Sequence, residues 1–236
     1  MMCRLCQKDR MLCDSHIVPE FIYRDCYNDD HVMMGINGLG NKGWKALQKG
    51  LREKLLCRDC EQFLNDKYEK PFLKEWGAIP FPRKMNAEEI ITIKVGYPVV
   101  KLFILSVLFR ESVSTLPTFA AVRLGPHEDR LRQMLLNENV GEEWCYPILA
   151  MILVKHSGEV VQGVITQPYV GRFDGHTFYR QAFAGVDWSI LFSSHRNESF
   201  QRNSLRESGE FALIAHDWSR HPQIQAVHHI LKQRPE

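Results

Sequence analysis

The chain has 236 residues, of which 44% are hydrophobic and 25% charged, and its formal net charge is +2. These ordinary values exclude a wholly disordered chain, and they fit one large domain or two small ones. The longest apolar stretch, residues 99–109, is too short to span a membrane, which needs about 20 residues. Residues 1–10 show no signal-peptide pattern. We therefore expect a soluble cytoplasmic protein that does not bind membranes.

The first part of the chain, residues 1–85, is predicted to be a small domain rich in polar residues and cysteines. Its expected elements are a tight turn at 3–6, a strand at 11–18, a loop at 28–43, a helix at 54–72 and a linker at 76–86. Pro19 limits the strand because proline donates no backbone hydrogen bond. Four glycines favour the loop, and two prolines favour the linker. Apolar residues at helical spacing favour the helix.

The second part, residues 86–236, is predicted to be a mixed domain whose role the sequence does not reveal. Its expected elements are a β-rich segment at 87–95, helices at 98–111 and 128–137, strands at 146–154, 160–165, 177–183, 189–192 and 211–215, and a closing helix at 222–232. Pro98 suits the first turn of its helix, and Gly125-Pro126 is a start signal for the next. The pattern indicates the α+β class, with helices packed on an antiparallel sheet.

Seven cysteines are present, and four of them form two CxxC pairs, Cys3 with Cys6 and Cys57 with Cys60. An odd count without a secretory signal argues against a disulfide framework. Four thiolates suit tetrahedral zinc in a structural site, and the second pair lies at the start of a predicted helix, which stabilises thiolate charge. The alternative is two unrelated pairs, one of them redox-active. Since neither pair follows a βαβ strand, we predict a structural zinc site.

The order of motifs in residues 1–75 resembles the HNH endonucleases of the ββα-metal type, which have a zinc-bearing treble-clef frame. The shared features are a CxxC pair, then His16 followed by Ile-Val-Pro, then Leu-Leu-Cys-Arg-Asp-Cys-Glu opening a helix at residues 55–61. The His-Ile-Val-Pro string resembles the base motif in the HNH domain of CRISPR effector nucleases. The resemblance covers about a third of the chain, and residues 86–236 match no family that we can name.

The resemblance implies that His16 is the general base, which takes a proton from the water that attacks a phosphodiester. The near-neutral pKa of an imidazole suits this task. The residue before the base usually ligates the catalytic metal and is commonly Asp or His. This chain has Ser15 there, which as a catalytic residue could still hold the metal weakly, directly or through water. The alternative is that His16 packs beside the zinc site in a module derived from a nuclease.

The resemblance also places a second metal position just after the second CxxC pair. Glu61 stands there in place of the more usual His, and Asn65 is four residues further on, so both share one helix face. Their oxygens favour magnesium or manganese. The family's middle Asn corresponds either to Arg52, which also suits phosphate binding, or to Asn41 in the glycine-rich loop.

Basic residues precede the second CxxC pair and are candidates for binding nucleic acid. At helical spacing they are Lys42, Lys45, Lys49 and Arg52. They predict a track for phosphates beside the active site. The alternative is an ordinary solvated face, which is what most charge runs are.

These observations favour a metal-dependent nuclease that acts on DNA, with RNA as the second choice. Small HNH proteins of this kind occur in restriction, mobile elements and phage defence, often with an ATPase or reader partner. The main rival is a zinc-structured module that binds nucleic acid or protein without catalysis. A third reading is a toxin-like effector held inactive by a partner.

Overall fold

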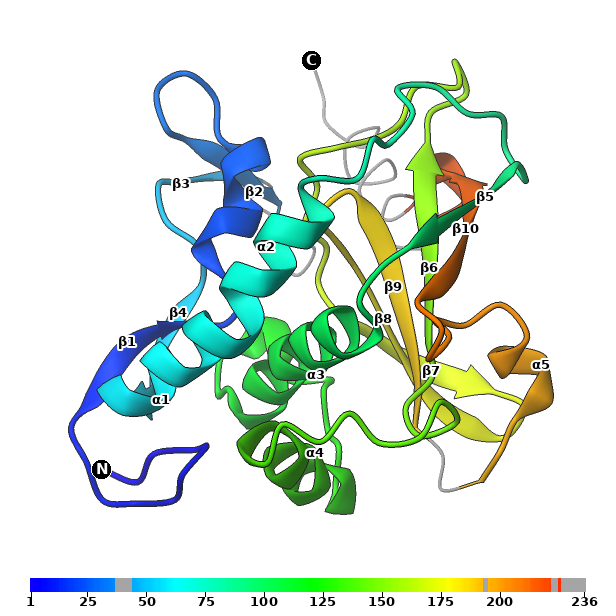
Figure 1. Ribbon diagram of the computed structural model, residues 1–236. Helices are drawn as coiled ribbons and strands as arrows, with labels where there is room; N and C mark the ends of the chain where they lie inside the picture. Colours follow the sequence, from blue (N-terminus) through cyan, green and yellow to red (C-terminus); the bar gives the residue numbers. More distant parts are fainter. Residues whose placement is uncertain (37–43, 193–194, 222–224, 226–236) are drawn as a thin grey trace.

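The computed structural model describes residues 1–36, 44–192, 195–221 and 225, and for residues 34, 36 and 44–46 it describes the backbone alone. Figure 1 shows the arrangement of helices and strands. None of the helices in these ranges is long and apolar enough to cross a membrane.

The first part of the chain combines two short strand pairs with one long helical segment. Its elements are β1 (Leu12–His16), the 3-10 helix η1 (Glu20–Cys26), β2 (Met33–Ile36), β3 (Trp44–Leu47), β4 (Arg52–Cys57), α1 (Arg58–Leu64), the π-helical turn η2 (Asn65–Glu69) and α2 (Lys70–Trp76). β1 pairs with β4 and β2 with β3, both antiparallel. α1, η2 and α2 follow one another without a break.

Two predictions for this part are corrected. The helix expected over 54–72 begins at Arg58, because residues 52–57 extend to pair with β1. The loop expected over 28–43 contains β2, whose partner is β3. Both errors have one cause: a strand is stabilised by a distant partner strand, which local periodicity does not reveal.

The second part is a six-stranded sheet with helices on one side. Its elements are β5 (Ile90–Lys94), α3 (Tyr97–Val113), the 3-10 helix η3 (Pro117–Phe119), α4 (Pro126–Leu136), β6 (Ile148–Val154), β7 (Tyr169–Phe173), β8 (His176–Phe183), β9 (Val186–Phe192), α5 (Glu198–Gln201), β10 (Glu210–Asp217) and the 3-10 helix η4 (Trp218–Arg220). The strand order is β5-β10-β6-β9-β8-β7. The α+β class is thus confirmed, although the sheet is mixed because β10 runs parallel to β6.

The strand expected over 160–165 is absent, and β7 forms instead. Residues 160–165 pass close to η1: a Cβ on Gly163, whose φ is +66°, would lie 2.1 Å from the carbonyl oxygen of Asp25. Only glycine permits this approach. The segment lies beside the sheet without forming a strand in it, since the backbone N–H of Val161 donates to the Leu153 carbonyl of β6 at 2.8 Å. The closing helix expected over 222–232 falls outside the described residues, apart from Gln225.

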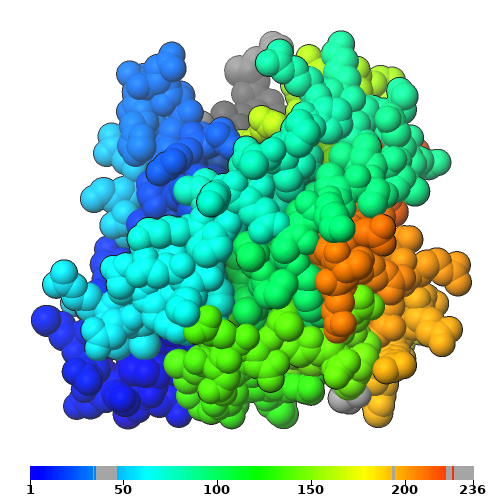
Figure 2. Space-filling view, viewed as in Figure 1, coloured from blue at the N-terminus to red at the C-terminus, as the bar shows by residue number. Residues whose placement is uncertain are grey.

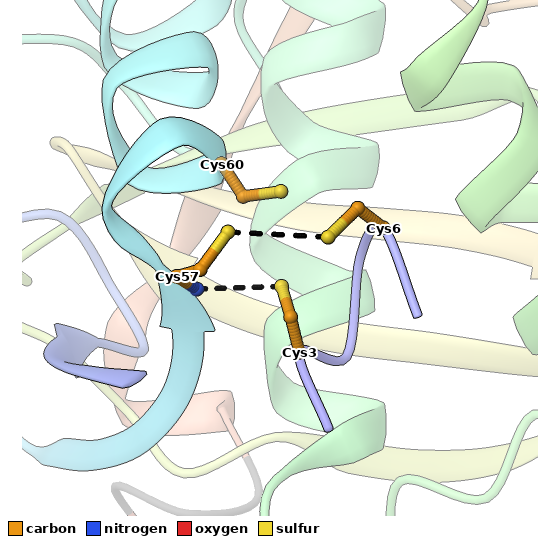
Figure 3. A group of neighbouring side chains, drawn as sticks. All are labelled: Cys3, Cys6, Cys57 and Cys60. Atoms are coloured by element: carbon orange, nitrogen blue, oxygen red, sulfur yellow. Dashed lines mark hydrogen bonds between the residues drawn. The ribbon is translucent and has the colours of Figure 1, made fainter. Parts of the chain in front are cut away.

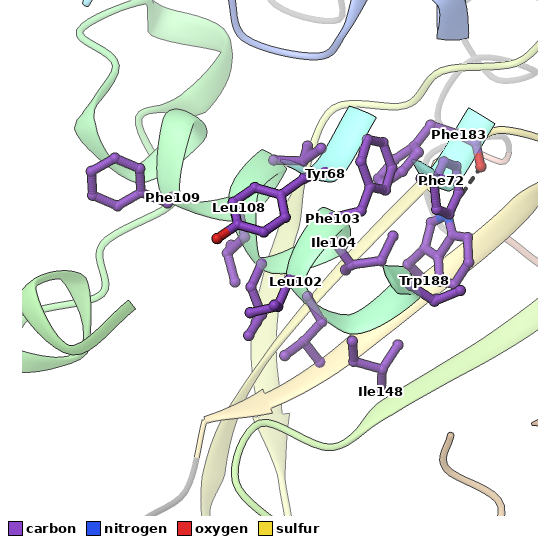
Figure 4. Close-up of a cluster of buried hydrophobic side chains, with 14 of the residues drawn as sticks. Tyr68, Phe72, Leu102, Phe103, Ile104, Leu108, Phe109, Ile148, Phe183 and Trp188 are labelled. Atoms are coloured by element: carbon purple, nitrogen blue, oxygen red, sulfur yellow. Dashed lines mark hydrogen bonds between the residues drawn. The ribbon is translucent and has the colours of Figure 1, made fainter. Parts of the chain in front are cut away.

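α3 is the central element of the fold. It is apolar on every side, and nearly all of its residues are buried, as expected for a helix enclosed by protein. Figure 1 shows it between the α1–α2 segment and the sheet. The ring of Phe103 on α3 stacks on Phe72 of α2 at 3.8 Å, and Phe72 also contacts Trp188 of β9. Figure 4 shows these rings within one cluster.

Buried residues from both sides of residue 85 belong to this same core, among them Cys3, Leu64, Phe103 and Trp188. The space-filling view likewise shows the N-terminal segments lying directly against the rest of the chain (Figure 2). The division into units 1–85 and 86–236 remains a prediction. Because the two parts of the chain share this core, a site on α1 can receive side chains from α3.

Candidate functional site

Four cysteine sulfurs converge where the N-terminal turn meets the junction of β4 and α1. The Sγ atoms of Cys3, Cys6, Cys57 and Cys60 all lie within 4.8 Å of one another, and those of Cys6 and Cys57 are 3.9 Å apart. Figure 3 shows them pointing toward a common centre. Sulfurs bound tetrahedrally at about 2.3 Å from zinc lie about 3.8 Å apart. The spacing therefore fits a structural metal ion such as zinc.

The backbone around the sulfurs and the chemistry of the thiols support the same conclusion. The backbone N–H of Cys57 donates to Cys3 Sγ at 3.3 Å, and the N–H of Gln7 closes the turn onto the Cys3 carbonyl at 2.9 Å. Burial and the neighbouring cysteines raise the pKa of the Cys60 thiol. Thiols packed this closely ionise together only when a cation offsets their charge. A divalent ion such as zinc, held by the four sulfurs, would supply that charge.

The strand pair β1–β4 places His16 beside the helical segment. His16 lies directly opposite Arg52, and Ser15 lies opposite Glu53. Successive side chains on a strand point to opposite faces, so Ser15 is buried while the side chain of His16 stays 21% exposed. β4 leads directly into α1, which fixes the distance between the four grouped cysteines and His16.

His16 opens into a cleft of about 220 Å³. Its polar lining consists of His16, Glu20, Arg24, Glu61, Asn65, Glu69, Lys70 and Arg110. Three of the predicted site residues, His16, Glu61 and Asn65, thus share one cleft. Glu61, Asn65 and Glu69 follow at intervals of four, which brings them to one side of the helical segment. A π-helical turn begins at Asn65, and such turns are frequent at functional sites.

The polar contacts that described residues make with the ring of His16 all involve Nε2. Nε2 lies 2.6 Å from Glu20 Oε2 and 2.8 Å from Arg52 Nε. Glu20 is itself held by Tyr27, whose hydroxyl donates to Oε1 at 3.0 Å. Burial and the Arg52 cation lower the pKa of His16, and Glu20 opposes them. This shift favours the uncharged form of the imidazole.

Glu61 is a half-buried residue whose carboxyl group has unused hydrogen-bonding capacity. Ser15 forms a hydrogen bond with it, and the hydroxyl of Ser15 also accepts the backbone N–H of Leu56 at 3.1 Å. Within the described part of the chain, Glu61 Oε1 is buried with no hydrogen-bond partner. Burial raises the pKa of Glu61, and Ser15 and Arg110 oppose the rise. Ser15 thus supports Glu61 and does not line the cleft.

Arg110 brings a cation to the cleft from α3. Its side chain is 1% exposed, and its Nη1 donates to Glu69 Oε1 at 2.8 Å and to the His16 carbonyl at 3.2 Å. Its Nη2 is buried without a partner among the described residues. A buried charge is tolerated when it is paired and hydrogen-bonded. The guanidinium therefore ties η2 and β1 to the central helix.

The predicted track of basic residues is only partly described. Lys42 and Asn41 lie outside the described residues, and for Lys45 the backbone alone is described. The helical spacing expected for the track is wrong, because β3 and β4 occupy this region with exposed Lys49 between them. Arg52 faces His16. These observations do not decide between Arg52 and Asn41 as the counterpart of the middle Asn of HNH endonucleases.

We compared the chain with protein-family models, curated proteins and solved structures. No match was found. Proposals about function therefore depend on the cleft itself, which also contains residues that the sequence did not single out. Glu20 and Glu69 could have been found from their spacing, four residues after His16 and four after Asn65. Arg110 had only one signal, a charged residue in a largely apolar helix.

Proposed function

We propose that this chain is a metal-dependent endonuclease of the HNH type that hydrolyses phosphodiester bonds, with His16 as the general base. The observation that carries the proposal is the shared cleft of His16, Glu61 and Asn65 beside a four-cysteine group. DNA is the preferred substrate and RNA the second choice. A role in restriction or phage defence, with an ATPase or reader partner, belongs to the same proposal and rests on the resemblance.

In this proposal His16 removes a proton from water. The water oxygen then forms a bond to phosphorus, and the bond from phosphorus to the leaving sugar oxygen breaks. Glu20 orients the imidazole through Nε2, so that Nδ1 is the nitrogen that accepts the proton. Ser15 orients Glu61. Arg24 and Lys70, both exposed at the cleft, attract the phosphates on either side of the cleaved bond.

The donor atoms of Glu61 and Asn65 suit magnesium or manganese. Within the described ranges, only the four cysteines form a group of three or more Cys, His, Asp or Glu ligands close enough to hold a metal. Magnesium is commonly bound by one or two carboxylates together with substrate phosphates, so a sparse set of protein ligands is compatible with it. The ion, when bound with substrate, would stabilise negative charge on the phosphate.

The small number of protein ligands for a catalytic ion favours a second candidate, a zinc-structured module that binds nucleic acid or protein without cleaving it. The two candidates differ in one requirement, because only the nuclease needs an ion at Glu61. Measuring manganese binding and nucleic-acid cleavage in the zinc-loaded protein separates them.

Replacing Glu61 with Gln is expected to weaken manganese binding and cleavage together. Loss of even an indirect partner of a bound metal costs about 10–100-fold in affinity or activity, so the loss of a ligand should cost at least about tenfold. Asn65→Ala should have a smaller effect, because a neutral amide attracts the ion less than a carboxylate does. Electron paramagnetic resonance of Mn²⁺ and a cleavage assay on labelled duplex DNA give the two readouts.

The neighbouring exposed residue Gln62, which does not line the cleft, provides the control as Gln62→Ala. Manganese affinity that is the same in Glu61→Gln and in Gln62→Ala would refute the site.

Reversing the charge of Arg24 and Lys70 is expected to weaken binding to duplex DNA. Lys70 pairs with Asp66 at 2.6 Å, but both side chains are largely exposed, so the pair is weak and Lys70 can turn to a phosphate. Each phosphate contact adds about 0.9 to the slope of log affinity against log salt concentration, so the Arg24→Glu/Lys70→Glu variant should lose about 2. Fluorescence anisotropy at several salt concentrations measures this slope. Lys94→Glu, on the edge strand β5, should leave it unchanged.

A further inference from the structure

Nε2 of His16 faces one hydrogen-bond donor, Arg52, and one acceptor, Glu20. Arg52 Nε, at 2.8 Å, carries a hydrogen and needs a lone pair on Nε2. Glu20 Oε2, at 2.6 Å, is buried and receives no hydrogen bond from the described residues in this arrangement, and its lone pairs need a hydrogen on Nε2. One nitrogen cannot meet both requirements at once. The two contacts therefore describe two alternative hydrogen-bonding states of one ring.

The two states differ in whether His16 can act as a base. A neutral imidazole carries one hydrogen, on either Nε2 or Nδ1. When Nε2 accepts from Arg52, the hydrogen is on Nδ1, and neither nitrogen has a free lone pair. When Nε2 donates to Glu20, Nδ1 has a free lone pair, and no described residue forms a hydrogen bond with it. Only the second state can take a proton from water.

The two partners are held unequally. Glu20 is fixed by the hydrogen bond from Tyr27. Apart from Nε2, the contacts of Arg52 with the described residues are long ionic ones, 3.9 Å to Asp14 and 3.8 Å to Glu20, and its side chain is 28% exposed. A guanidinium binds phosphate in a bidentate manner and more strongly than it binds a neutral imidazole. Arg52 is thus the partner that a phosphate can draw away.

We infer that Glu20 and Arg52 compete for Nε2 of His16, and that a substrate phosphate which binds Arg52 leaves this nitrogen to Glu20 and so makes Nδ1 the base. The inference rests on the proposed nuclease function. Both residues are positioning residues in this scheme. The change of state moves no net charge: one proton leaves Nδ1 for water, and another binds Nε2 from water. The base is therefore formed only when a phosphate is present.

The test measures the tautomer of His16 directly, by ¹⁵N nuclear magnetic resonance of the zinc-loaded full chain, with His16→Asn used to assign the signal. Arg52→Met leaves Glu20 as the partner and should shift the ring toward the Nε2–H form. Glu20→Leu leaves Arg52 and should shift it toward the Nδ1–H form. Arg24→Met, which removes an arginine that lines the cleft, should leave the tautomer unchanged. If Arg52 and Glu20 had only structural roles, their substitution would not shift the His16 tautomer in opposite directions.

Adding a short DNA duplex without divalent ion should shift the unmodified protein toward the Nε2–H form, and Arg52→Met should show no further shift. In kinetics, Arg52→Met should chiefly raise KM, whereas Glu20→Leu should chiefly lower kcat. Equal or same-direction tautomer shifts in the two variants would overturn the inference, as would a duplex that binds without changing the tautomer. Failure of the duplex to bind would instead overturn the proposed function and, with it, the triggering step.

Discussion

Replacing His16 with Ala is expected to reduce cleavage by about 10²–10⁴-fold, the usual contribution of a general base. The fold should be retained, because the side chain is partly exposed and lies outside the four-cysteine group. Glu20 and Arg52, already 3.8 Å apart, can then pair with each other. Labelled duplex DNA, single-stranded DNA and RNA are the substrates, each with magnesium or manganese. Zinc content and thermal unfolding report on the fold.

His156→Ala provides the matched control, since His156 is exposed and does not line the cleft. The pH profile gives a second check. Burial and Arg52 lower the pKa of His16 from its ordinary value of 6.5. The uncharged base is lost as pH falls through the lowered pKa, so the acid limb of the rate profile should lie below 6.5. Cleavage by His16→Ala at the rate of the unmodified protein would exclude the mechanism. Duplex binding without cleavage by either protein would favour the binding module.

Replacing Cys57 with Ser is expected to release zinc and to open the N-terminal part of the fold. Cys57 joins β4 to α1, and Cys3, Cys57 and Cys60 are almost fully buried. Structural zinc contributes roughly 10–16 kcal/mol of binding free energy in small zinc domains, which becomes folding free energy. Elemental analysis should find about one zinc per chain before the substitution and almost none after it. Hydrogen exchange should rise in β1, β4 and α1 more than in β8 and β9.

Cys13→Ser is the control, because Cys13 lies on β1 but is not one of the four grouped cysteines. It should keep the zinc and the protection of β4. A well-folded preparation of the unmodified protein without zinc would contradict the prediction, and so would a Cys57→Ser variant with full zinc content.

The sequence alone determined the parts of this protein whose signals are local. The two CxxC pairs predicted a metal group because thiolates at that spacing have few other uses, and the four sulfurs do converge. The apolar run around Phe103 predicted a helix, and α3 is that helix. Spacing along one helix placed Glu61 and Asn65 together, and both line the cleft. In each case the residues concerned are near neighbours in sequence or share a strong chemical preference.

Only the tertiary structure decided which groups surround His16. Arg52 reaches it because β4 pairs with β1 in one particular register, while the sequence suggested a helix for neighbouring residues. Arg110 reaches it because α3 packs beneath the helical segment, and nothing near residue 110 indicates that contact. The strand expected over 160–165 is likewise absent, and the segment instead contacts β6 through Val161 and approaches Asp25 at Gly163. Hydrogen bonds and packing between distant segments depend on how whole elements pack together. Such contacts produce no local sequence pattern from which they could be predicted.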